Sequence, residues 1–211
     1  MASLKRQLRG QRTGRLTAAP LAASLVALAL GFGVATARAD DGALPKIPSK
    51  TPLKVGFAQT ESNNPWRLAQ TASMKAEAER LGWQLVYTDA AGSAAKQVAD
   101  VNSMIAQGVD AIFLSPREEK PLIPAVMAAK KAGIPLFLID RGVDPNLAKA
   151  GVDYVTFIGS DFLLEGKQAA DWLVKKVDGK GIILEIEGST GSSPANDRKK
   201  GFDDVIAQNP G

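Results

Sequence analysis

The chain has 211 residues, of which 45% are hydrophobic and 23% charged, a composition typical of a globular protein. Its formal charge of +4 is misleading, because six basic and no acidic residues precede Asp40, which leaves 26 − 6 = 20 basic against 22 acidic residues in the rest. Because the residues from Asp40 onward are nearly neutral in total, the charge argues against a nucleic-acid partner. Because the chain has no His and no Cys, it has no imidazole base, thiol nucleophile, disulfide or ordinary zinc site.

The first 39 residues have the layout of a secretory signal peptide. A basic segment, 1–15, precedes an apolar run, 16–34, and the small residues of 35–39 suit signal peptidase, so we predict cleavage after Ala39. The alternative is a membrane anchor, but Pro20, Gly31 and Gly33 interrupt the apolar run and leave it short of the roughly 20 residues that a span needs. Residues 40–52 are rich in Pro and read as a linker.

Beyond the linker, short apolar segments alternate with amphipathic ones. Val98, Val101 and Ile105, for example, recur at helical spacing. The pattern predicts strands at 53–58, 83–87, 111–114, 135–139, 154–158 and 181–186, and helices at 66–81, 94–107, 121–131, 165–177 and 197–207. Such alternation indicates an α/β protein with a parallel sheet covered on both faces. Ligands of such sheets bind outside the carboxyl ends of the strands, so the residues after each strand are the candidates for a site.

The segment after the first predicted strand offers an aromatic side chain beside a donor. Asn64 suits a helix N-cap and Pro65 the first helical position, which places Trp66 and Arg67 in the first turn. An aromatic face packs against the C–H face of a sugar ring, and a guanidinium donates to hydroxyls. The alternative, left open at this point, is a Trp packed under the loop with a solvated Arg.

Two further strands are followed by charged residues. Arg117 follows the third strand at a position from which a ligand is within reach. Asp140 and Arg141 follow the fourth strand and combine an acceptor with a five-donor group, as a polyhydroxyl ligand requires, although a structural ion pair is the alternative. The small polar loop of 188–198 lacks the spacing of a phosphate-binding or dinucleotide motif.

Several long runs of the mature sequence, between Leu53 and Gln208, point to one protein family. They are 55–57 with Trp66 and Arg67, 106–113, 138–141, 164–167 with 171–174, and 197–202. In these runs the chain resembles the ribose/galactose-type periplasmic sugar-binding proteins of ABC importers, most of all the galactofuranose-binding type.

The resemblance implies a fold and a set of ligand contacts. The fold is the two-lobed periplasmic-binding-protein type I fold, with a nearly complete first lobe at 53–159 and an incomplete second lobe at 160–211, whose remaining strands and contacts would lie beyond Gly211. The contacts carried over are Asn64, Trp66, Asp140, Arg141 and, from the second lobe, Arg198. The position after Trp66 is aromatic in ribose binders but is Arg67 here, as in the furanose type, which argues against ribose itself.

The resemblance therefore implies a periplasmic substrate-binding component of an ABC sugar importer that binds a monosaccharide, galactofuranose or a related sugar. Its partners would be that sugar and a permease in the inner membrane, and the full-length protein would be a monomer without metal or cofactor. The alternative is a periplasmic domain that delivers its ligand to a membrane signalling receptor. A repressor of this fold would begin with a basic helix-turn-helix, and an enzyme would need an acid–base pair that the sequence does not offer.

Overall fold

The computed structural model describes residues 43–211, so the predicted signal peptide and its cleavage site lie outside the described residues. Residues 43–52, most of the predicted linker, form neither helix nor strand. The strands are β1 (Lys54–Gln59), β2 (Gln84–Asp89), β3 (Ala111–Leu114), β4 (Leu136–Ile139) and β5 (Thr156–Ile158). The helices are α1 (Pro65–Arg80), α2 (Ala94–Ala106), α3 (Ile123–Lys131), α4 (Phe162–Lys176) and α5 (Ser193–Ile206).

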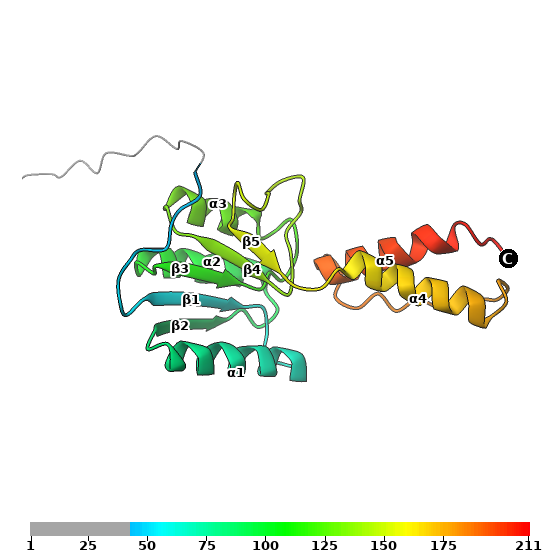
Figure 1. Ribbon diagram of the computed structural model, residues 1–211, viewed down its shortest axis with the longest axis horizontal. Helices are drawn as coiled ribbons and strands as arrows, with labels where there is room; N and C mark the ends of the chain where they lie inside the picture. Colours follow the sequence, from blue (N-terminus) through cyan, green and yellow to red (C-terminus); the bar gives the residue numbers. More distant parts are fainter. Residues whose placement is uncertain (1–42) are drawn as a thin grey trace, which may run out of the picture. The chain divides into compact units, whose positions relative to one another are not determined.

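The five strands form one parallel sheet in the order β2-β1-β3-β4-β5, which can be followed from bottom to top in Figure 1. Helices connect the first four strands, as parallel neighbours require. The predicted parallel α/β architecture is therefore confirmed, and all five carboxyl ends meet at one edge of the sheet.

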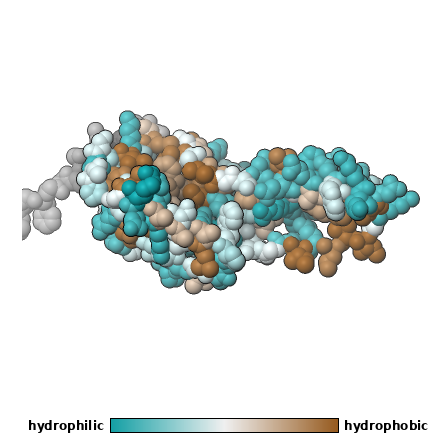
Figure 2. Space-filling view, turned by 60° about the horizontal axis from the view of Figure 1, so that its bottom comes forward, coloured by the Kyte–Doolittle hydropathy of each residue, from teal (hydrophilic) through white to brown (hydrophobic). Residues whose placement is uncertain are grey.

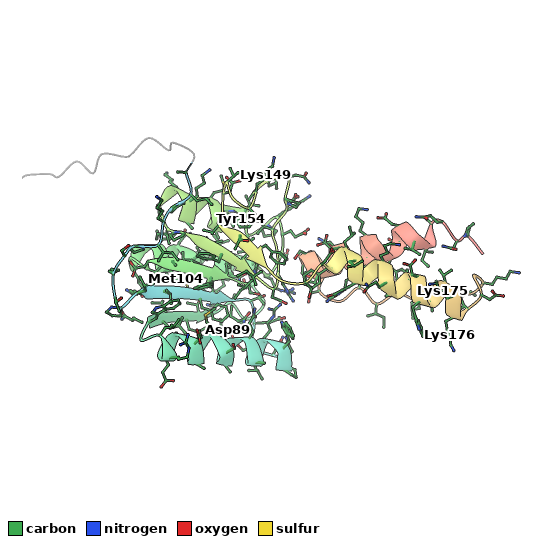
Figure 3. The ribbon with its side chains drawn as sticks, viewed as in Figure 1. Asp89, Met104, Lys149, Tyr154, Lys175 and Lys176 are labelled. Atoms are coloured by element: carbon green, nitrogen blue, oxygen red, sulfur yellow. The ribbon has the colours of Figure 1, made fainter. Side chains whose placement is uncertain are left out.

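One face of the sheet is fully covered and forms the core. Ile112 and Leu114 of β3 and Leu138 of β4 are completely buried there against apolar side chains of α2 and α3. Met104 of α2, labelled in Figure 3, lies so close to β1 that a Cβ added to Gly56 would be 2.6 Å from its sulfur atom. The glycine thus permits the close approach of helix and strand.

The opposite face is only partly covered. Helix α1 packs along β1 and β2, but no described helix covers β3, β4 and β5 on this side. Phe113 and Phe137 stack there with ring centroids 5.3 Å apart, and Ile158 remains 58% exposed. The prediction of a sheet covered on both faces is therefore wrong for these three strands in the described part of the chain.

Local capping explains where the helices begin. The Asn64 side chain accepts a hydrogen bond from the Arg67 amide at 3.0 Å, and the Asp161 side chain accepts one from the Leu164 amide at 2.9 Å. Helix α4 consequently begins three residues before the predicted position. The remaining predicted elements before residue 160 agree with the structure within two residues at each end.

The predicted sixth strand, 181–186, is wrong. The segment is neither helix nor strand. Among residues 43–211 no strand lies beside it, and a strand needs a neighbour to share its hydrogen bonds. Ile182, Leu184 and Ile186 are 105%, 88% and 89% exposed, and Figure 2 shows hydrophobic surface on this part of the molecule. Glu185 and Glu187 alternate with them and contact Lys199 of α5 at 2.9 and 3.4 Å.

Helices α4 and α5 form a closely packed pair. A Cβ added to Gly166 would collide with the Arg198 carbonyl group, and one added to Gly201 with the Leu163 carbonyl group. The two helices therefore approach backbone to backbone at these glycines. None of the helices in the described residues is long and apolar enough to cross a membrane.

Candidate functional site

The carboxyl ends of β1, β3 and β4 bring charged residues from three loops together, and the loop after β2 adds a glycine beside them. Glu61 follows β1, Gly92 follows β2, Arg117 follows β3, and Asp140 and Arg141 follow β4. Arg67 joins them from the first turn of α1. Since these residues are far apart in the sequence, the strand order of the sheet is what makes them neighbours.

The strongest interaction at this edge joins Arg67 to Asp140. A guanidinium nitrogen (Nη2) of Arg67 lies 2.6 Å from Oδ2 of Asp140, and the two side chains are 4% and 16% exposed. Asp140 has a left-handed backbone (φ 64°), which short polar residues tolerate better than others, and its amide donates to the Ile158 carbonyl oxygen at 2.8 Å. The β4–β5 pairing therefore holds the carboxylate in place.

The other hydrogen bonds of Arg67 are also internal. Its Nη1 donates to Oε1 of Gln70 at 2.8 Å and to Oγ of Ser115 at 2.9 Å. Gln70 in turn accepts from Nε2 of the fully buried Gln59 at 3.0 Å. Arg67 is thus a buried connector between α1 and the ends of β1, β3 and β4. Direct donation from Arg67 to a ligand stays a prediction.

Arg141 is buried but loosely paired. It is 8% exposed, its Nη1 donates to the Arg117 carbonyl oxygen at 3.3 Å, and its Nη2 lies 3.9 Å from Oε1 of Glu61. Burial and, next, the positive charge of Arg67 lower the pKa of Arg141 to about 10. The close ion pair of Asp140 is with Arg67 and not with Arg141, its neighbour in the sequence. The sequence had suggested an ion pair between Asp140 and Arg141 as the alternative to ligand binding.

Arg117 is positioned by a residue that the sequence did not single out. Gln97 of α2 is completely buried, and its Oε1 accepts from the Arg117 amide at 2.8 Å. Its Nε2 donates to the carbonyl oxygens of Ala58 and Ser115 at 3.2 and 2.7 Å, so one side chain ties together the ends of β1 and β3. The Arg117 side chain donates from Nε to the Gly92 carbonyl oxygen at 3.2 Å, while its Nη1 is buried without a partner.

The remaining predicted contacts differ in their surroundings. Asn64 caps α1, and Trp66 is 64% exposed, so it is not packed under the loop. Arg198 lies on α5, where its Nε donates to Glu165 at 2.8 Å and its Cζ lies 4.7 Å from the centre of the Phe162 ring. Both of these partners belong to α4, so the hydrogen bond and the cation–π contact of Arg198 lie within the helix pair.

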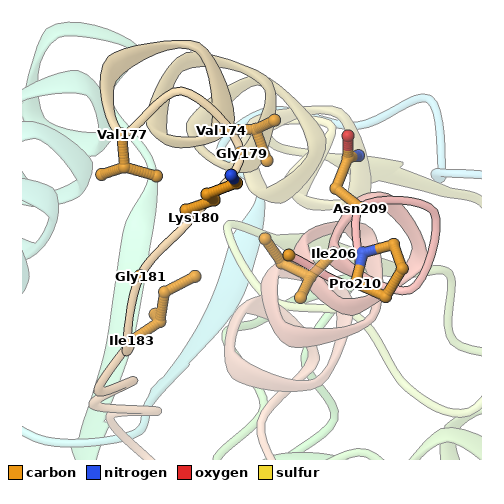
Figure 4. A pocket seen from close by; sticks show the side chains of 10 residues that line it. Val174, Val177, Gly179, Lys180, Gly181, Ile183, Ile206, Asn209 and Pro210 are labelled. Carbon is orange, nitrogen blue, oxygen red and sulfur yellow. The ribbon is translucent and has the colours of Figure 1, made fainter.

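Other features of the described residues do not compete with the strand ends as a site. A hollow beside α4 and α5, shown in Figure 4, is lined mainly by apolar side chains and contains none of the predicted contacts. Within residues 43–211, no cluster of three or more acidic side chains is positioned to hold a metal ion.

A parallel α/β lobe that presents an exposed Trp, a buried carboxylate and two Arg side chains at its strand ends belongs to the class of small-ligand binders. A family model described as a periplasmic binding protein domain matches residues 55–211. The chain therefore belongs to the periplasmic binding protein family.

The chain is similar to several characterised members of that family. It is 42% identical over 169 residues to the galactofuranose-binding protein YtfQ of Escherichia coli (strain K12), covering 80% of this chain and 52% of YtfQ. Among solved structures, it resembles the periplasmic binding protein component of the arabinose ABC transporter from Shewanella sp. ANA-3, bound to α- and β-L-arabinofuranose (39% identity, TM-score 0.65, 74% of this chain and 51% of that one).

It also resembles the fructose-binding periplasmic domain of the hybrid two-component system BT1754 (30% identity, TM-score 0.68, 75% of this chain and 51% of that one). In all three comparisons, the chain spans about half the length of its relative.

Proposed function

We propose that the complete protein is the substrate-binding component of an ABC sugar importer and binds a monosaccharide in the periplasm. The preferred ligand is galactofuranose or a related furanose, since YtfQ is a galactofuranose-binding protein and the Shewanella protein holds arabinofuranose. The partner would be the permease of that importer in the inner membrane, and the binding protein itself would act as a monomer and not as an enzyme.

The observation that carries this proposal is the pairing of acceptors and donors at the strand ends. Arg67 fixes Oδ2 of Asp140, which leaves Oδ1 of that carboxylate to accept from a ligand hydroxyl. The guanidinium groups of Arg141 and Arg117 supply donors at the neighbouring strand ends, and Nη1 of Arg117 is buried without a partner among the described residues. Each sugar hydroxyl both donates and accepts, so it needs both kinds of group.

The exposed Trp66 supplies the apolar element of the proposed site. Its ring is available to pack against the C–H face of a sugar, an interaction for which aromatic side chains are well suited. Asn64 would bind from the same helix start, and Arg198 would approach from the second lobe, which we place at 160–211 and onward, against a first lobe at 53–159. Closure of the two lobes on the sugar would exclude water from these contacts.

A second candidate is a sensor domain that passes ligand occupancy to a membrane receptor. Its support is the likeness to the fructose-binding domain of a hybrid two-component system. The two candidate functions share the sugar-binding site. They differ in the membrane protein that binds the closed, ligand-bound form.

Calorimetric titration of the full-length protein with galactofuranose, arabinofuranose, fructose and ribose tests the binding proposal. We expect micromolar or tighter binding of a furanose, and no binding by any of the four sugars would refute it. Uptake of the bound sugar by a strain lacking the gene separates the candidates, because an importer component is required for uptake and a sensor domain is not.

A further inference from the structure

Glu61 is an acidic residue at the strand-end site, where it follows β1 and faces Arg141. It follows Thr60, which is completely buried and whose carbonyl oxygen accepts from the Gly92 amide at 2.8 Å. The Thr60 amide donates to Oε1 of Gln59 at 2.9 Å. Since both backbone polar groups of Thr60 are held in this way, the loop fixes the point from which the Glu61 side chain extends.

The carboxylate of Glu61 is largely withdrawn from solvent but poorly partnered. Its side chain is 13% exposed. Its nearest cation is Nη2 of Arg141 at 3.9 Å, which is too long for a hydrogen bond, and Nδ2 of Asn63 lies 3.4 Å from Oε2. A carboxylate accepts about four hydrogen bonds, and burial without partners is costly. Glu61 therefore keeps acceptor capacity that the described residues do not use.

The surroundings of Glu61 leave room for a ligand group. Gly92, at the end of β2, has a positive φ of 79°, and a Cβ added there would lie 3.6 Å from Oε2 of Glu61 and 3.9 Å from Nε of Arg117. Because Gly92 has no side chain, Oε2 of Glu61 and the Arg117 guanidinium border the same space, while Nη2 of Arg141 lies 3.9 Å from the other carboxylate oxygen. Asp140 differs from Glu61 in having one oxygen committed to Arg67 at 2.6 Å.

We propose that Glu61 is a ligand contact that helps to determine specificity, accepting a hydrogen bond from a sugar hydroxyl whose neighbouring hydroxyl accepts from Arg141 or Arg117. The ligand class that this arrangement fits is a monosaccharide with two adjacent hydroxyls. The inference rests on the proposed sugar-binding function and adds a second acceptor to Asp140. The competing explanation is that Glu61 serves only as a counter-charge for Arg141.

Calorimetry of the full-length protein against its best sugar and a series of single-deoxy analogues distinguishes these explanations. Glu61→Gln should weaken binding of the parent sugar roughly 10- to 100-fold, the range for a lost hydrogen bond to a charged group. For the one analogue that lacks the contacted hydroxyl, the loss should be about threefold or less, because wild type and variant then lack the same interaction. Glu79→Gln, on the exposed side of α1, is the matched control and should bind every sugar as wild type does.

Glu61→Asp is a second variant, which keeps the negative charge near Arg141 but shortens the side chain by one methylene group. Its loss of affinity should likewise be large for the parent sugar and small for the analogue that lacks the contacted hydroxyl. An equal loss for every analogue, in both variants, would overturn the inference and leave Glu61 as a counter-charge. Unchanged affinity for the parent sugar would overturn it as well. Absence of sugar binding by the wild-type protein would instead refute the proposed function, and the inference with it.

Discussion

Breaking the buried ion pair between Arg67 and Asp140 by removing one partner should cost much of the protein's stability, because it leaves a buried charge without a counter-ion. Asp140→Asn removes the negative charge and leaves Arg67, whose side chain is 4% exposed, without its counter-ion. Loss of one partner from a buried pair costs about 3–5 kcal/mol. The Asn oxygen still accepts a weaker hydrogen bond worth about 1 kcal/mol, and Asn tolerates the positive φ at this position. We therefore expect a loss of about 2–4 kcal/mol in the free energy of unfolding.

Urea denaturation of the chain, followed by far-UV circular dichroism, measures this loss. Arg67→Met should also destabilise, but the double variant should be more stable than the sum of the two losses implies, by about 2 kcal/mol, since no unpaired charge then remains. Asp171→Asn is the control, because it breaks an exposed pair with Lys167 (56% and 43% exposed) and should cost less than about 0.5 kcal/mol. A loss below 0.5 kcal/mol for Asp140→Asn, or strict additivity in the double variant, would refute the reasoning.

Three further predictions concern Glu119, the pair of helices α4 and α5, and the segment 181–187. Burial and, to a smaller extent, the charge of Asp197 raise the pKa of Glu119 above its usual value of 4.5. As the pH falls, Glu119 therefore takes up a proton in the folded state before it does so in the unfolded state. The charged carboxylate destabilises the folded protein, and protonation removes this cost. Glu119→Gln should accordingly stabilise the protein at pH 7.5 and reduce the change of the urea midpoint as the pH rises from about 4.5 through the raised pKa of Glu119. An unchanged pH dependence would contradict this. Gly201→Ala should force α5 away from the Leu163 carbonyl group and cost about 1–3 kcal/mol, visible as faster hydrogen exchange in both helices of the pair. Limited digestion with thermolysin should cut first within 181–187, where apolar side chains are exposed in an unpaired segment, and first cuts inside the sheet would contradict the structure.

The sequence alone determined much of the scaffold. Apolar strands such as 111–114, amphipathic segments such as 94–107, and the Asn64-Pro65 start of α1 are local signals, which depend on residues within one or two turns of one another. For the same reason, the sequence located the polar positions at the strand ends, including Asp140 and Arg141. The sequence wrongly predicted a strand at 181–186. The apolar composition of this segment is typical of a strand, but composition cannot supply the neighbouring strand that pairing requires.

The contacts among these polar residues depend on the three-dimensional fold and could not be predicted from their order in the sequence. Asp140 forms its close ion pair with Arg67, from a helix far away in the sequence, and not with the adjacent Arg141. The structure also revealed Gln97 and Glu61, which no motif marks, as neighbours of Arg117 and Arg141. These contacts follow from the strand order β2-β1-β3-β4-β5 and from the left-handed backbone at Asp140. Both are set by packing of the whole sheet, since hydrogen bonds and ion pairs depend on distances of a few ångströms that sequence spacing does not encode.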